Sequence, residues 1–235
     1  MKILMLSVLL SAATNLLGQS ILEAVEQKDY GKVSQLIKNK DVVNKKGKNG
    51  MTPALKAVTV NDLSILKLLV ENGADINRAN DAGWTPLMVA CQDGYTMIAK
   101  YLIDKGSDVN SKDVHNWTPA IIASRNGNDE ILDVLIEKGA DVNAIAADRS
   151  TALLIASYKG HEDVVTTLLA NGATVNNINR DEETALSVAA QQGHTGIVKK
   201  LLAHKADRNF KTSDGKSICD IVRNAGHKEI CDLLE

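Results

Sequence analysis

The chain has 235 residues, of which 44% are apolar, 24% are charged and 3% are aromatic. This apolar content excludes a disordered chain, and the small numbers of proline (3) and glycine (16) exclude a collagen-like or proline-rich fibre. A net charge of −2 provides no broad cationic surface, so nucleic acid is not an expected partner.

The N-terminus has the pattern of a secretory signal peptide. Lys2 precedes an apolar run from Ile3 to Ala13, and small and polar residues follow. The run is shorter than the roughly 20 apolar residues that span a membrane. Cleavage after Ala13 or Gly18 fits the pattern, and we favour Gly18 because the repeated region begins just after it. Residues 1–18 are therefore predicted to be a signal peptide, with no stable membrane insertion after cleavage; an uncleaved anchor or a packed first helix are the alternatives.

The rest of the chain repeats with a period of 33 residues. At this spacing a small hydroxyl residue, called here the hydroxyl position, recurs six times: Thr52, Thr85, Thr118, Thr151, Thr184 and Ser217. Other residues keep the same step, mostly Ala five residues after the hydroxyl position, mostly Gly nine after, Leu 17 after and Asn 25 after. A register without insertions or deletions indicates a stack of equivalent units.

Each repeated residue has a local structural reason. A Thr or Ser hydroxyl accepts the unpaired N–H groups that open a helix, and proline, which follows it in three units, suits the first helical position. The Gly nine residues later ends this first helix in a left-handed conformation. A second helix follows and ends at another glycine: Gly73, Gly106, Gly139 or Gly172. Turn-forming residues come next, so each unit is predicted to be helix, turn, helix and extended turn.

The stretch GWTPLMVACQDGYTMIAKYLIDKGSDVN, from Gly83 to Asn110, resembles an ankyrin repeat, and the resemblance covers about residues 19–235. It implies an all-α solenoid of stacked helix–turn–helix units with finger-like turns, about seven repeats including caps. The first helices would line a concave face. The family usually has His three residues after the hydroxyl position, where this chain has Leu55, Met88, Ile121, Leu154, Ser187 and Asp220. Four of these are apolar, so we expect packing to replace hydrogen bonds there.

The repeat boundaries follow from the register. An N-terminal cap repeat is predicted at 19–46, because Ser20 to Glu23 form a capping-box pattern that starts a helix. Five full repeats follow: 47–79, 80–112, 113–145, 146–178 and 179–211. A truncated C-terminal cap repeat occupies 212–235, where Arg223 and Asn224 replace smaller or apolar residues, as a solvent-facing end requires. Residues 19–235 are thus predicted to form one ankyrin repeat domain.

The histidines and cysteines do not predict a metal or catalytic site. His161, His194 and His227 share one register, one per repeat, so they are roughly 8–10 Å apart and cannot share a zinc ion. We expect them to brace turns. Cys91 is predicted to be a free, buried thiol. Cys219 and Cys231 are expected not to meet, since one lies near a helix start and the other midway along the antiparallel partner helix; a disulfide between them is the less favoured alternative.

A protein-binding surface is predicted beside the extended turns. The residue before the hydroxyl position is tryptophan in two successive units. The first-helix residue seven positions after the hydroxyl position is polar or aromatic in three successive units. Tryptophan, tyrosine and arginine dominate binding energy at protein interfaces. The predicted binding residues are Met51, Trp84, Gln92, His115, Trp117, Arg125 and Tyr158. The alternative is that the tryptophans only shield the bases of the turns.

Together these features predict a non-catalytic interaction scaffold or adaptor that is exported, periplasmic or secreted, and monomeric, and that binds a partner protein through its concave and finger face. Two alternatives stay open: an accessory protein that docks on and protects or regulates an exported enzyme, and a secreted effector acting on a foreign cell. We expect no enzyme and no cofactor, because the repeat accounts for almost every residue. The leader without a disulfide framework favours a bacterial, periplasmic setting.

Overall fold

The computed structural model of the chain describes residues 20–234, so the predicted signal peptide lies outside the described residues. These residues are helical wherever they form regular structure, apart from two isolated bridges, Ile145 to Thr151 and Lys211 to Ser217. This confirms the predicted all-α fold. Within the described range, none of the helices has the length and hydrophobicity that a membrane span requires.

The chain divides by its internal contacts into two units, Met1–Asp108 and Val109–Glu235. In the first unit residues 20–26 are helical, which agrees with the helix predicted to start at Ser20. The helices that follow are α2 (Tyr30–Leu36), α3 (Lys40–Val43), the 3₁₀ turn η1 (Lys48–Gly50), α4 (Pro53–Thr59), α5 (Leu63–Glu71), α6 (Pro86–Asp93) and α7 (Thr96–Asp104).

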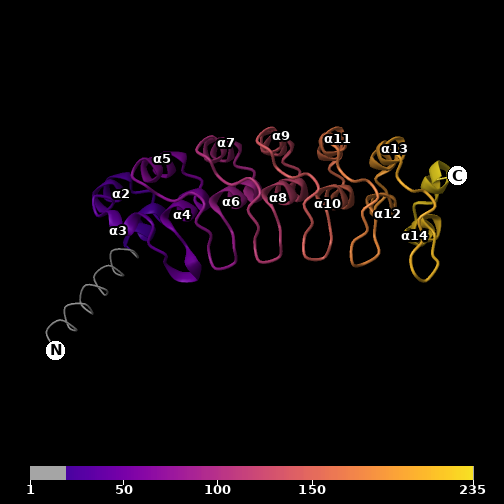
Figure 1. The fold of residues 1–235 in the computed structure, drawn as a ribbon, viewed down its shortest axis with the longest axis horizontal. Helices are drawn as coiled ribbons and strands as arrows, with labels where there is room; N and C mark the ends of the chain where they lie inside the picture. The colour runs from indigo at the N-terminus through magenta and orange to yellow at the C-terminus, as the bar shows by residue number, and fades with distance from the viewer. Residues whose placement is uncertain (1–19, 235) are drawn as a thin grey trace, which may run out of the picture. The chain divides into compact units, whose positions relative to one another are not determined.

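The second unit continues the same alternation. Its helices are α8 (Pro119–Asn126), α9 (Asp129–Glu137), α10 (Ala152–Lys159), α11 (Glu162–Ala170), α12 (Ala185–Gln191), α13 (Thr195–Ala203), α14 (Ile218–Ala225), the 3₁₀ turn η2 (Lys228–Ile230) and α15 (Cys231–Leu234). Within this unit, the first helices α8, α10, α12 and α14 pack on one another in order, and so do the second helices α9, α11 and α13 (Figure 1). The extended turns, called fingers here, project from the side of the first helices that faces away from the second helices (Figure 1). They are residues 77–84 in the first unit, and 110–117, 143–150, 176–183 and 209–216 in the second.

The hydroxyl positions cap the first helices as predicted. Thr118 Oγ1 accepts a hydrogen bond from the Ile121 N–H, and Pro119 occupies the first helical position. The four apolar residues that stand three after the hydroxyl position are all buried: Leu55, Met88, Ile121 and Leu154. In the last two first helices, where the residue is polar, Ser187 and Asp220 instead bond back to the backbone N–H of the hydroxyl position and complete reciprocal capping boxes.

An asparagine in the register 25 residues after the hydroxyl position joins five of the repeats to the repeat that follows. Asn143 Oδ1 accepts from the Thr174 N–H at 2.7 Å, and its Nδ2 donates to the Gly172 carbonyl at 3.2 Å. The same pair of bonds is made in register by Asn44, Asn77, Asn110 and Asn176. A single spacing repeated along the chain thus becomes a series of inter-repeat hydrogen bonds.

Histidine and glycine meet across repeats, which confirms the predicted turn-bracing role. His161 Nε2 lies 3.0 Å from the Arg125 carbonyl oxygen of the preceding repeat, and His194 makes the same bond to Tyr158 at 3.2 Å. Gly127 has a φ of +72°, and a Cβ on it would lie 2.8 Å from His161 Nδ1. Glycine is therefore required there both by the left-handed backbone and by the approach of the imidazole.

None of the three cysteines, all of which lie in the described part of the chain, forms a disulfide bond. Cys91 is buried as predicted, and burial raises the pKa of its thiol well above the usual range. The expectation that Cys219 and Cys231 stay apart is wrong, because Cys231 Sγ lies 3.7 Å from the Cys219 carbonyl oxygen. The short 3₁₀ turn η2 before Cys231 returns the chain against α14, so the last helical pair is not the regular antiparallel pair of the other repeats.

Candidate protein-binding surface

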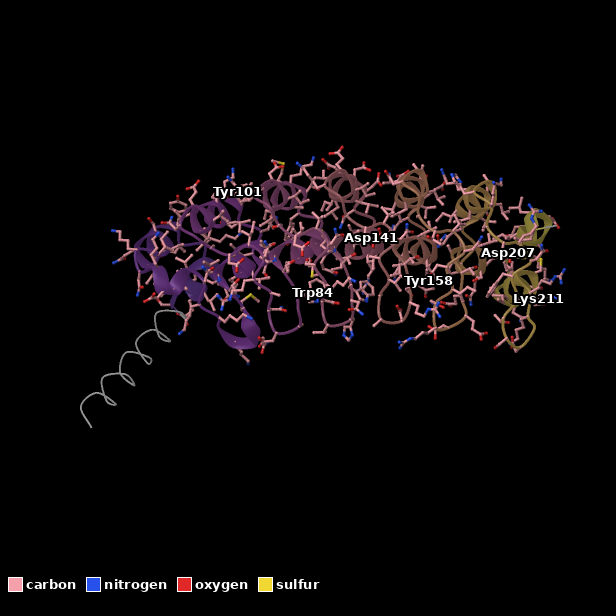
Figure 2. All side chains as sticks on the ribbon, in the orientation of Figure 1. Trp84, Tyr101, Asp141, Tyr158, Asp207 and Lys211 are labelled. Carbon is pink, nitrogen blue, oxygen red and sulfur yellow. The ribbon has the colours of Figure 1, made fainter. Side chains whose placement is uncertain are left out.

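The seven predicted binding residues fall into two sets, one in each unit. Met51, Trp84 and Gln92 belong to the first unit, and all three are half-buried. Trp84 closes its finger through the backbone, since its N–H donates to Asn80 Oδ1 at 2.9 Å and its carbonyl accepts from the Asn80 N–H at 3.0 Å. Its indole lies on the finger side of α6 (Figure 2). The tryptophan therefore stands at the base of a finger, which both the binding and the shielding interpretations require.

In the second unit, Trp117 and Arg125 form a stacked pair. Arg125 Cζ lies 5.2 Å from the centroid of the Trp117 ring, which is a cation–π distance. Trp117 is held at the end of its finger by backbone hydrogen bonds to Asp113, and Arg125 projects from the last turn of α8. Arg125 is exposed and Trp117 half-buried, so the pair presents a rigid aromatic and cationic surface beside the finger.

The fingers of the second unit are joined to one another. His115, exposed on the first of them, accepts a hydrogen bond on its carbonyl oxygen from the Ala147 N–H at 2.9 Å. The Arg180 N–H donates to the Asp148 carbonyl at 2.8 Å, which joins the next two fingers. These bonds hold the fingers in a fixed row, so His115 acts through its backbone as a link while its ring stays exposed.

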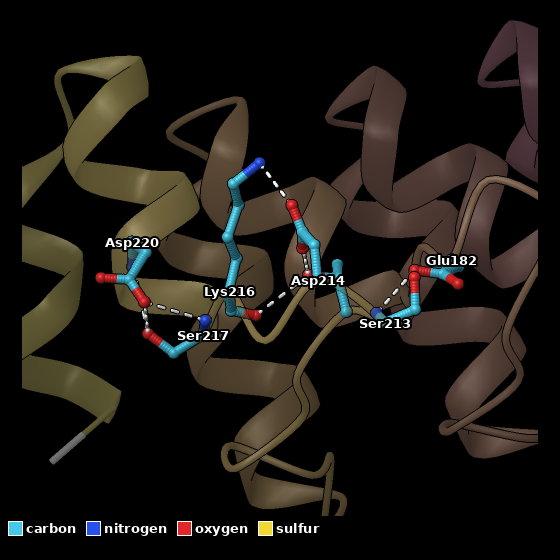
Figure 3. A network of polar contacts seen from close by, with 7 residues as sticks. Glu182, Ser213, Asp214, Lys216, Ser217 and Asp220 are labelled. Carbon is cyan, nitrogen blue, oxygen red and sulfur yellow. Dashed lines mark hydrogen bonds and ion pairs between the residues drawn. The ribbon is translucent and has the colours of Figure 1, made fainter.

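The last finger is tied down by side chains (Figure 3). Glu182 Oε2 accepts from the Ser213 N–H at 2.8 Å, which lowers the pKa of Glu182. Hydrogen bonds from Lys216 and Thr212 lower the pKa of Asp214 to about 2. A bond from Ser217 likewise lowers the pKa of Asp220, the capping-box carboxylate. Each of these carboxylates accepts hydrogen bonds from residues of this finger or directly beside it, so the contacts stabilise the finger.

Tyr158 opens onto a pocket of about 300 Å³. Tyr158 is 44% exposed and lies on the finger side of α10 (Figure 2). The residues that line the pocket come from α10 and from the two fingers beside it: Asp148, Ser150, Leu154, Ile155, Tyr158, Asn179, Asp181 and Glu183. Among these, only Tyr158 was predicted as a binding residue. Ser150 and Glu183 share the register of Trp117, so a sequence signal for them existed in the same column of the repeat.

Within residues 20–234, no group of three or more His, Cys, Asp or Glu side chains is placed to hold a metal ion. The structure thus brings Trp117 into contact with Arg125, places Tyr158 at a separate pocket, and leaves the binding role of all seven residues a prediction.

Comparison with known families supports the repeat architecture. The family model for ankyrin repeats (3 copies) matches residues 21–113, 112–179 and 153–235, which together cover nearly all described residues. No curated protein matches the chain.

Proposed function

Because the chain belongs to the ankyrin repeat family, whose members are generally protein–protein interaction modules, we propose that it is an exported, non-catalytic scaffold that binds a partner protein through its fingers and first helices. The observation that carries this proposal is the Trp117–Arg125 stack beside a row of hydrogen-bonded fingers. Both residue types are common among the side chains that contribute most to protein binding. A surface held in place before binding also loses little conformational entropy when the complex forms.

Export rests on the N-terminal sequence. Lys2, the apolar run from Ile3 to Ala13 and the small residues before Gln19 have the order of a cleavable leader. We propose that the protein acts in the periplasm or outside the cell. N-terminal sequencing of the protein recovered from its own cells tests this: a chain beginning at Gln19 supports export, and a chain that retains Met1 in the cytosol contradicts it.

Affinity capture tests the binding proposal. The tagged full chain is expressed in its native host, cross-linked and recovered, and the bound proteins are identified by mass spectrometry. A Trp117→Ala, Arg125→Ala variant removes the stacked pair, whereas Glu137→Ala changes an exposed residue on α9, away from the fingers. Loss of a specific partner in the first variant but not in the second supports the proposal. Equal capture by all three proteins, with unchanged circular dichroism, refutes the assignment of this surface.

A further inference from the structure

The pocket beside Tyr158 lies where two registers of the repeat change their side chains. In the preceding repeat, Trp117 and Arg125 occupy two registers that stack on each other. One period later these registers hold Ser150 and Tyr158. The small serine leaves open the place in which the previous repeat puts an indole, and the pocket of about 300 Å³ is lined by both residues. The pocket therefore coincides with a difference between two neighbouring repeats.

The lining of this pocket is anionic. It contains three carboxylates, Asp148, Asp181 and Glu183, and no lysine or arginine. Asp148 is fixed by bonds from the Ser150 N–H and hydroxyl at 2.9 and 3.0 Å, and Glu183 is fixed by a bond from Asn179 Nδ2 at 2.9 Å. The Asp181 carboxylate has no hydrogen bond or ion pair to any residue in the described part of the chain. The Asp148 and Glu183 carboxylates are thus oriented before any ligand binds, and the Asp181 carboxylate is available to accept hydrogen bonds from a ligand.

The remaining wall is aromatic and apolar. Tyr158, Leu154 and Ile155 supply it from α10. The Tyr158 ring already attracts one cation, since Lys159 Nζ lies 5.4 Å from its centroid. A group that satisfies this pocket must be cationic, must donate several hydrogen bonds and must present a flat face to an aromatic ring.

We propose that this pocket binds an arginine side chain of the partner protein, an inference that rests on the proposed scaffold function. A guanidinium group meets all three requirements: it is planar, it donates up to five hydrogen bonds, and it is less strongly hydrated than an ammonium group. A lysine side chain would satisfy the charge but not the flat face. The pocket thus selects the chemistry of the partner, while the Trp117–Arg125 pair supplies contact area in the preceding repeat.

Nuclear magnetic resonance titration of the full ¹⁵N-labelled chain tests this with a defined probe, N-acetyl-arginine amide. The lysine analogue compares the two cations, and the citrulline analogue is the uncharged match of arginine. We expect saturable shifts of the backbone amides of Ser150, Tyr158 and Glu183 with the arginine probe. The lysine analogue should bind more weakly, and the citrulline analogue should give no saturable shift.

Two variants locate the binding. Ser150→Trp restores the tryptophan that this register holds at Trp84 and Trp117, and it should abolish the shifts by filling the pocket. Asp181→Asn with Glu183→Gln removes two charges at nearly constant shape, and it should weaken arginine binding by roughly tenfold or more. The matched control, Glu137→Gln with Asp163→Asn, removes the same charge from exposed positions on α9 and α11 and should leave binding unchanged.

The outcomes are distinct. Saturable arginine binding that the pocket variants remove and the control keeps supports the proposal. Equal response to arginine and citrulline, equal or tighter binding of lysine, or equal loss in the control variant overturns it. Should Ser150→Trp fail to fold, the carboxylate variant decides alone. If the probe does not bind while capture of a protein still depends on Trp117 and Arg125, the pocket assignment fails and the scaffold function stands.

Discussion

Removal of one inter-repeat asparagine gives a defined loss of stability. In Asn143→Ala the side-chain bonds to the Thr174 N–H at 2.7 Å and to the Gly172 carbonyl at 3.2 Å are lost together. At about 1 kcal/mol of net stability for each hydrogen bond, the free energy of unfolding should fall by about 2 kcal/mol. Asn143→Asp keeps the acceptor and loses the donor, so it should cost about half as much.

The assay is urea unfolding of the full chain, followed by circular dichroism. Asn209 is the matched control: it stands in the same register, but its side chain has no hydrogen bond among residues 20–234. Asn209→Ala should change the free energy of unfolding by less than about 0.5 kcal/mol. Equal losses at Asn143 and Asn209, or a loss at Asn143 below about 0.5 kcal/mol, would refute the view that these bonds couple the repeats.

Three further predictions follow from single groups. Gly127→Ala should destabilise more than Gly139→Ala in the same unfolding assay, because both have positive φ but only Gly127 faces His161, whereas nothing lies within 4 Å of a Cβ on Gly139. The last finger should stay ordered above pH 4 and loosen as the pH falls toward 2. Hydrogen bonds lower the pKa of Asp214 from an ordinary 3.8 to about 2, so these bonds stabilise the folded chain above pH 3.8 and are lost when the carboxylate is protonated. A carboxyl ¹³C titration of Asp214 with a midpoint near 3.8 would contradict this. Cys91 should resist iodoacetamide at pH 8 in the folded chain and react after unfolding, because it is buried and its thiol pKa is raised. Mass mapping of the alkylated site checks this prediction, and rapid labelling of Cys91 in the folded chain would refute it.

Much of the fold could be predicted from the sequence because each repeated residue acts locally. Thr118, Pro119 and Gly127 specify a helix start and end by their own backbone preferences, so α8 has the predicted bounds. The inter-repeat role of Asn143 was not predicted, although its register was. Its partners lie 29 and 31 residues further on, and spacing alone does not say which backbone groups will face an amide.

The candidate site was less accessible to sequence reasoning. Trp117 and Arg125 were recognised from residue type, yet their contact depends on how a finger base approaches the last turn of the first helix. The pocket beside Tyr158 was missed because it is lined by a small residue, Ser150, in the register where the preceding repeat has Trp117. Large aromatic and cationic side chains can be recognised from the residue type alone. A pocket beside a small residue is indicated only by the difference between that residue and its counterpart in the neighbouring repeat. The proximity of Cys231 to Cys219 was missed because η2 breaks the regular helical pair.

Hydrogen–deuterium exchange of the captured complex tests the scaffold claim most directly. We predict that the partner slows exchange in the fingers 110–117 and 143–150 and in α8 and α10, while α9 and α11 exchange as in the free protein. Slowed exchange confined to α9 and α11, with the fingers unaffected, would contradict it.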